Sequence, residues 1–147
     1  MTEIWKDIPG YEGLYQVSNL GQVRSLNYKR TGKTKLLKLC VNTYGYYNVS
    51  LRKNNLRKAC VVHRLVAITF IKNENNLPCI NHKDEVKTNN HVDNLEWCDY
   101  KYNTNYGTAI QRGANKRKVK VNCYNLSGKL VKKYNSIKDT KKDGYIP

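Results

Sequence analysis

Along residues 1–55, short apolar alternations are interrupted by Gly, Pro and Asn. The segment 5–19 mixes these turn signals with alternating apolar positions, and the segment 23–26 continues the pattern after Gly21. Residues 44–51 form a further run that is rich in Tyr and Val, which favour strands. Such patterns predict strands joined by tight turns. We therefore expect residues 1–55 to form a β-rich N-terminal module.

Between residues 60 and 71 the alternation gives way to apolar residues at roughly helical intervals, which predicts a buried helix. Residues 79–80 and 95–98 read as two short extended segments on either side of a polar loop. Asp99 is suited to cap a helix that runs towards Gly107, where glycine favours a stop.

The last third of the chain reads as a linker followed by a hairpin. Residues 112–120 combine Gly and Asn with a basic run, which predicts a flexible, charged linker. Beyond it, alternating positions up to residue 124, a turn at 125–128 and a segment at 129–134 predict two returning strands. Ser136 is placed to cap a short final helix.

Composition adds a strong positive charge to this α+β pattern. Lys and Arg total 27 against 11 Asp and Glu, for a formal net charge of +16. Such a charge favours a nucleic acid as partner, with an ordinary solvated basic surface as the alternative. No apolar stretch approaches the roughly 20 residues that cross a bilayer, and the first residues lack the apolar core of a signal peptide. We expect a cytoplasmic protein with no membrane partner.

The five cysteines are scattered and form no C-x-x-C pair. Their odd number and spacing argue against a disulfide framework and against a zinc knuckle. Candidate catalytic and metal-binding residues are therefore expected among other residue types.

Residues 81–103 hold groups suited to hydrolysing a phosphodiester. The reaction requires a base for water, a cation to stabilise developing charge, and residues that hold both in place. The imidazole of His82 suits the base, since its ordinary pKa of about 6.5 lies near working pH. Side-chain oxygens in the same stretch suit Mg²⁺.

Four short segments follow one another in this region: Asn81–Asp84, Lys87–Asn90, Asn94–Trp97 and Asn103. Together they resemble the HNH motif of phage- and intron-encoded HNH homing endonucleases, and segments 5–13 and 62–67 resemble sequences that accompany this nuclease. The resemblance implies a ββα-metal (HNH, or His-Me finger) fold, in which two strands and a helix surround one divalent metal. It also implies a phage or another mobile element as the source.

The resemblance assigns roles to four residues. His82 is implied as the general base, and Asn81 and Asn103 as ligands of one Mg²⁺ or Mn²⁺ ion. The resemblance implies that Asn94 does not bind the metal. It instead tethers the loop between the strands and so orients the imidazole.

This chain departs from the family pattern at two places. Asn81 stands where relatives often have Asp, so we expect metal binding that is weaker or depends more on the DNA phosphate. Glu85 and Val86 stand where Gly-Asn is common, and both are poorly suited to a left-handed turn. Asp84 is better read as a turn former than as a metal ligand. His63, on the predicted helix, is favoured as a hydrogen-bonded core residue over a site residue.

Two basic clusters are expected to contact the DNA backbone, with ordinary solvated charge as the alternative. Their members are Arg52, Lys53, Arg57 and Lys58 in one cluster, and Lys116, Arg117 and Lys118 in the other.

These observations predict three segments in an α+β protein. Residues 1–55 form a β-rich DNA-binding module, residues 56–112 the HNH nuclease core, and residues 113–147 a basic linker with a partial DNA-binding module. The predicted activity is metal-dependent nicking or homing cleavage of double-stranded DNA by a monomer. One alternative is an HNH scaffold with weakened catalysis that acts as a DNA-binding or regulatory protein. Another is an RNA-binding structural protein, which leaves the spacing from Asn81 to Asn103 unexplained.

Overall fold

The computed structural model describes residues 2–145 and has the predicted α+β architecture. The chain divides into two compact units, residues 1–103 and residues 104–147. In the described part of the chain, no helix is both long and apolar enough to span a bilayer.

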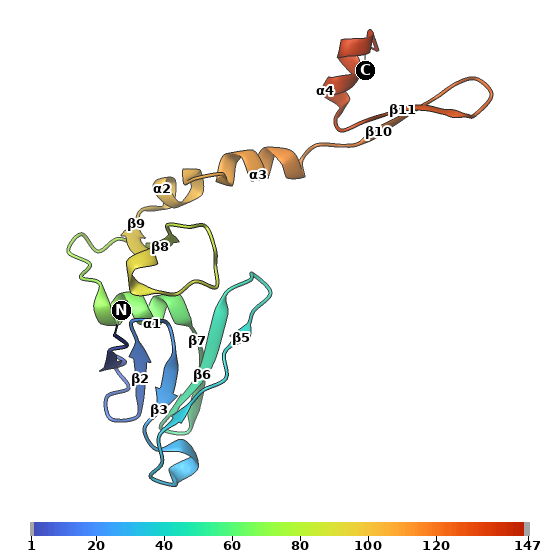
Figure 1. The fold of residues 1–147 in the computed structure, drawn as a ribbon. Helices are drawn as coiled ribbons and strands as arrows, with labels where there is room; N and C mark the ends of the chain where they lie inside the picture. The colour runs from blue at the N-terminus through green and yellow to red at the C-terminus, as the bar shows by residue number, and fades with distance from the viewer. Residues whose placement is uncertain (1, 146–147) are drawn as a thin grey trace. The chain divides into compact units, whose positions relative to one another are not determined.

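The first unit begins with two antiparallel sheets, as the alternating pattern predicts (Figure 1). The four-stranded sheet has the order β1-β2-β3-β4, and the 3₁₀ helix η1 separates its last two strands. The three-stranded sheet has the order β5-β6-β7. The bounds are β1 Trp5–Asp7, β2 Tyr15–Ser18, β3 Val23–Ser25, η1 Tyr28–Arg30, β4 Lys35–Leu36, β5 Cys40–Val41, β6 Tyr47–Lys53 and β7 Leu56–Val61.

A helix and a second hairpin complete the first unit. The predicted buried helix is confirmed as α1, and the two extended segments are confirmed as the antiparallel strands β8 and β9. Asp99 caps the following helix α2, because its Oδ1 accepts the backbone N–H of Tyr102 at 2.7 Å. The bounds are α1 Val62–Phe70, β8 Cys79–His82, η2 Val92–Asn94, β9 Leu95–Cys98 and α2 Tyr100–Asn105.

One hydrophobic core joins these elements. Helix α1 lies between the N-terminal strands and the β8–β9 hairpin, and it contacts β2, β6, β7, β8 and β9 (Figure 1). The buried apolar residues are Ile8, Val17, Val23, Val49, Leu51, Val62, Leu65, Val66, Ala67, Ile80 and Leu95. The predicted boundary between residues 55 and 56 falls in the two-residue turn of the β6–β7 hairpin. The N-terminal strands and the hairpin that carries His82 therefore depend on the same packing, while the three-segment division of roles stays a prediction.

The second unit consists of helix α3, the hairpin β10–β11 and two short helical turns. The prediction of a flexible linker over residues 112–120 is wrong for its first half, because residues 112–116 belong to α3. Gln, Arg, Ala and Lys in this segment favour a helix and outweigh the cost of Gly113. The predicted returning strands and the Ser136 cap are confirmed. The bounds are α3 Ala109–Lys116, β10 Val121–Tyr124, β11 Leu130–Tyr134, α4 Ile137–Thr140 and η3 Lys141–Asp143.

The shared core predicts the effect of truncating Leu51, which is fully buried on β6. Leu51→Ala should lower the free energy of unfolding by about 2–5 kcal/mol, since the lost burial adds to the cost of a cavity. Leu56, at the start of β7, is 77% exposed, so Leu56→Ala is the control and should change stability by less than about 0.5 kcal/mol. Urea unfolding followed by tryptophan fluorescence measures both, because Trp5 and Trp97 lie in this unit. Equal midpoints for the two variants would contradict the shared core.

Candidate functional site

The β8–β9 hairpin positions the two residues at the centre of the predicted site. In its register Asn81 lies opposite Glu96, and His82 lies opposite Leu95. Consecutive side chains of a strand point to opposite faces, so Asn81 and His82 leave β8 on different sides. Each is only 5% exposed.

His82 lies among aromatic and polar groups. Its Nε2 is 3.3 Å from Oδ1 of Asn90. Its ring centroid is 5.0 Å from that of His63 and 5.9 Å from that of Tyr46. Burial lowers the pKa of His82 below its usual value, against the opposing effect of the Asn90 hydrogen bond. The imidazole is therefore held in the neutral form, which is the form that accepts a proton.

His63 was expected to be a hydrogen-bonded core residue, and this expectation is wrong in the structure. Its Nδ1 is buried and has no hydrogen-bond partner. Its ring instead packs against both Tyr46, at 4.9 Å between centroids, and His82. Burial, with the charges of His82 and Arg64, lowers the pKa of His63 to about 3. A neutral His63 puts no positive charge beside His82.

Asn94 ties together the two ends of the loop between β8 and β9. Its Nδ2 donates to Asn89 O at 2.8 Å and to Asp84 Oδ1 at 2.9 Å. Its Oδ1 accepts the backbone N–H of Asp84 at 3.0 Å. These bonds have the geometry that a loop tether requires, and the predicted effect on the His82 imidazole stays a prediction.

Asp84 is the predicted turn former. Its Oδ1 accepts the backbone N–H of Val86 at 2.8 Å, and hydrogen bonding, chiefly from the Asn89 side chain, lowers the pKa of the Asp84 carboxyl. Glu85 adopts a positive φ of 60°, so this chain makes a left-handed turn without the glycine that would favour it. The Asp84 and Asn94 bonds on either side of Glu85 supply the compensating interactions.

Asn81 faces a carboxylate that sequence reasoning did not single out. Its Nδ2 donates to Oε1 of Glu96 at 2.7 Å, and the same oxygen accepts the hydroxyl of Tyr102 at 3.2 Å. Asn103 follows Tyr102 on α2, is exposed, and donates its backbone N–H to Asp99 O. Glu96 thus links the Asn81 side chain to α2, whereas convergence of Asn81, His82 and Asn103 on one ion stays a prediction.

The donor chemistry of this region fits a hard divalent cation. Within residues 2–145, no group of three or more His, Cys, Asp and Glu side chains is arranged to hold a metal. The available donors are the amide oxygens of Asn81 and Asn103 and the carboxylate of Glu96, which are oxygen ligands of the kind that Mg²⁺ and Mn²⁺ accept.

The first predicted basic cluster lies on the β6–β7 hairpin. Arg52 and Arg57 are directly opposite in the register, and both are exposed. Like charges in cross-strand positions cost stability, and a bound anion relieves that cost. Lys58 lies opposite the buried Leu51, and Lys53 ends the strand.

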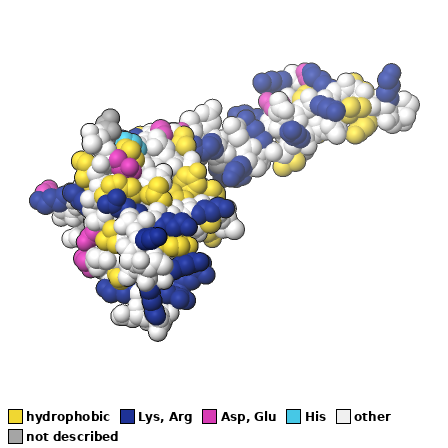
Figure 2. All heavy atoms as spheres, turned by 60° about the horizontal axis from the view of Figure 1, so that its bottom comes forward, with side chains coloured by type: hydrophobic (Ala, Val, Ile, Leu, Met, Phe, Trp, Pro, Cys, Tyr) yellow, Lys and Arg dark blue, Asp and Glu magenta, His cyan; other side chains and the backbone are white. Residues whose placement is uncertain are grey.

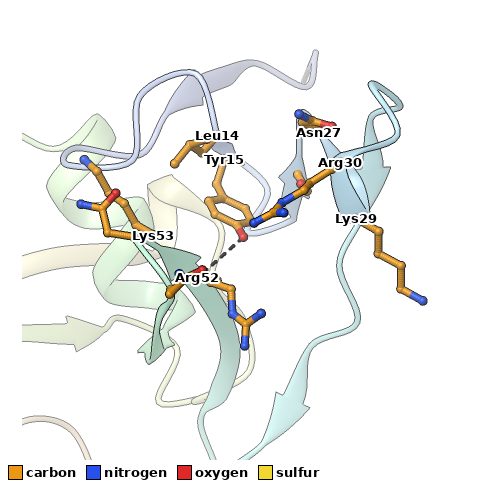
Figure 3. Close-up of a pocket in the computed structure, with 10 residues that line it drawn as sticks. Leu14, Tyr15, Asn27, Lys29, Arg30, Arg52 and Lys53 are labelled. Atoms are coloured by element: carbon orange, nitrogen blue, oxygen red, sulfur yellow. Dashed lines mark hydrogen bonds between the residues drawn. The ribbon is translucent and has the colours of Figure 1, made fainter.

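Arg52 and Lys53 also line a pocket of about 770 Å³ together with Arg30 and Lys29 (Figure 3). Figure 3 shows Arg30 reaching towards the ring of Tyr15, whereas Lys29 points away from it. The hydroxyl of Tyr15 accepts the backbone N–H of Arg52 at 3.2 Å. Figure 2 shows Lys and Arg side chains gathered over this end of the first unit.

The second basic cluster lies in the other unit. Lys116 ends α3, Arg117 follows as its C-cap and Lys118 comes next. All three are exposed.

Sequence reasoning missed three contributors: Asn90, Glu96 and Arg30. Glu96 lies opposite Asn81 only because β8 extends to His82, two residues beyond the predicted extended segment. No local signal distinguishes Asn90 from Asn89, or Arg30 from the other basic residues of its segment.

Comparisons with known proteins show similarity to HNH endonucleases. Residues 3–52 match the NUMOD4 motif. An HNH endonuclease of Acanthamoeba polyphaga mimivirus is 41% identical over 138 residues, which cover 93% of this chain and 39% of that protein. The DNA endonuclease I-HmuI of Bacillus phage SP01 is 46% identical over 99 residues, which cover 67% of this chain and 54% of the relative. This chain therefore spans only part of the length of these relatives.

A solved structure is similar over most of both chains. The structure that describes DNA binding and cleavage by the HNH homing endonuclease I-HmuI superposes with a TM-score of 0.60 and 37% sequence identity. The similarity covers 95% of this chain and 82% of that one. On this evidence from both sequence and fold, the chain belongs to the family of HNH homing endonucleases.

Proposed function

We propose that the protein is a metal-dependent HNH endonuclease that hydrolyses phosphodiester bonds in double-stranded DNA. The observation that carries the proposal is the environment of His82, a buried and neutral imidazole held at Nε2 by Asn90 on the hairpin of an HNH fold. That arrangement leaves the second ring nitrogen available to take a proton from water.

Two groups of residues support the base. Asn94 holds the loop that contains Asn90, and so acts on His82 through that loop. Asn81 and Asn103 are the proposed ligands of a single Mg²⁺ or Mn²⁺ ion, which when bound supplies positive charge for the phosphate oxygens.

Glu96 compensates for the neutral side chain of Asn81 at the proposed metal site. Because the amide nitrogen of Asn81 donates to Glu96, its oxygen is directed away from that carboxylate and is available as a ligand. Glu96 also brings back the negative charge that an Asp at position 81 would have supplied.

One proposed site per chain determines how many DNA strands a single protein molecule cuts. We propose that a monomer nicks one strand of DNA, and that a double-strand cut takes a second site or a second event. Arg52, Lys53, Arg57 and Lys58 would contact the backbone, as would Lys116, Arg117 and Lys118. We propose that the protein acts in the cytoplasm of a cell that carries a phage or mobile element.

A second candidate function is a DNA-binding or regulatory protein on an HNH scaffold with weakened catalysis. The neutral Asn81 favours it, because fewer charged ligands mean weaker metal binding.

His82→Ala separates the two candidates in a supercoiled-plasmid assay with Mg²⁺ or Mn²⁺. The wild-type chain should relax the plasmid, and the variant should lose at least about 100-fold in rate, because general-base catalysis contributes that much. His91→Ala is the matched control, since the described contacts of the His91 side chain are with the backbone N–H and the carboxylate of Asp93. Relaxation by the His82 variant at the wild-type rate would remove His82 as base, and a wild-type chain that binds but never relaxes DNA would favour the second function.

Glu96→Gln tests the charge at the metal site in the absence of DNA. Gln keeps an oxygen for Asn81 and Tyr102 but removes the charge, so Mn²⁺ affinity should fall by about 10-fold or more. Glu74→Gln is the control, because Glu74 is exposed and pairs only with Lys72 at 2.6 Å among the contacts described. Electron paramagnetic resonance of free Mn²⁺ measures both, and equal affinities would exclude Glu96 from the site.

The double variant Arg30→Ala with Arg52→Ala tests the basic pocket. DNA affinity should fall, and the slope of log affinity against log salt should become shallower by about one for each lost phosphate contact. Lys72→Ala removes an exposed charge outside the pocket and serves as control. Fluorescence anisotropy without divalent metal gives both slopes, and a slope equal to that of the control would exclude the pocket.

A further inference from the structure

Asn90 lies between the proposed base and the N-terminal strands. It is 4% exposed, and its Oδ1 faces Nε2 of His82 at 3.3 Å. Its backbone and Cβ pack against Gly21, in the turn between β2 and β3. A Cβ atom on residue 21 would lie 2.7 Å from Asn90 Cβ, closer than such atoms approach in proteins, and 3.1 Å from Asn90 O. Only glycine leaves Asn90 in its present position.

The same turn is bonded to the segment that follows Asn90. The backbone O of Asn19 accepts the N–H of Val92 at 2.8 Å. Asn19 is itself fixed, because its Oδ1 accepts the N–H of Ile4 at 2.7 Å and its N–H donates to Ile4 O at 3.0 Å. The 18–21 turn therefore holds residues 90–92 by one hydrogen bond and one close packing contact.

Resting on the proposed function, we propose that the 18–21 turn is a positioning element of the nuclease site. It holds Asn90 so that the amide oxygen fixes His82 as the tautomer protonated at Nε2. An amide oxygen can only accept a hydrogen bond, so Nε2 has to carry the proton and Nδ1 is left as the basic atom. Gly21 and Asn90 are thus positioning residues that act through His82, and residues 1–55 do more than contact DNA.

The chemistry explains why this contact matters. A neutral imidazole that loses its Nε2 acceptor exchanges between two tautomers and can rotate in its pocket. Only the tautomer with a free Nδ1 offers a base on the side away from Asn90. Displacement of Asn90 therefore lowers the fraction of molecules with a correctly placed base, without removing any group that reacts.

The tautomer of His82 is measured directly by long-range ¹H–¹⁵N NMR of the full chain at mildly alkaline pH without metal. The chain has three histidines, and the His82→Gln variant assigns the signals. The wild type should show the Nε2–H pattern. Gly21→Ala should lose this pattern in favour of a mixture of tautomers, because the new methyl group displaces Asn90.

Gly10→Ala is the matched control. Gly10 has the same φ of +82° as Gly21, but a Cβ there meets nothing within 4 Å. Both variants pay the same backbone strain, and only the variant at Gly21 should change the His82 signals. Identical His82 signals in the two variants would overturn the proposal.

Variants at Asn90 test the same point if Gly21→Ala fails to fold. Asn90→Ala should give mixed tautomers, and Asn90→Asp, which keeps an acceptor oxygen, should restore the Nε2–H pattern. Asn90→Ala with a wild-type pattern would refute the assignment. With plasmid DNA, Gly21→Ala and Asn90→Ala should lower kcat by about 10- to 100-fold with KM unchanged. Tautomers that change as expected in a chain that never cuts DNA would retain the positioning and reject the proposed function.

Discussion

The packing of α1 against both the N-terminal strands and the β8–β9 hairpin is the constraint on which the rest of the structure depends. Val62, Leu65 and Val66 on this helix are buried in the core, while His63, on the same helix, reaches the ring of His82. The β8–β9 hairpin, with two four-residue strands, is too small to be stable alone. Its geometry depends on packing against the larger core, so a change that disturbs this packing also changes the surroundings of His82.

Burial of His82 sets the electrostatics of the site. Desolvation lowers the pKa of His82 and outweighs the Asn90 hydrogen bond and the Asp84 carboxylate, which both raise it, so the neutral base is favoured. The other face of β8 carries a charge. There Glu96 places a full negative charge against Asn81 and Tyr102, where a cation would be stabilised. One strand thus has a buried, neutral imidazole on one side and a carboxylate on the other.

Local periodicity was enough to predict β2, β3, α1 and the β8–β9 strands, and the Asp99 cap followed from residue type alone. The general arrangement of His82 and Asn94 on a hairpin followed from the resemblance. The ring neighbours of His82 did not, because His63 and Tyr46 reach the hairpin only through the tertiary fold, as Gly21 reaches Asn90. The helix α3 was missed because a basic composition was read as flexibility, although its residues also favour a helix.

The two faces of the β6–β7 hairpin have opposite effects on its stability, because one carries repelling charges and the other is packed in the core. Arg52 and Arg57 repel each other across the β6–β7 hairpin, which lowers its stability. Both arginines are exposed, while Val49 and Leu51 of β6 are buried. Because the buried apolar face anchors the strand, the exposed face tolerates the repulsion between the two guanidinium groups. The two arginines at the turn end of this hairpin are therefore separate from the residues that contact His82.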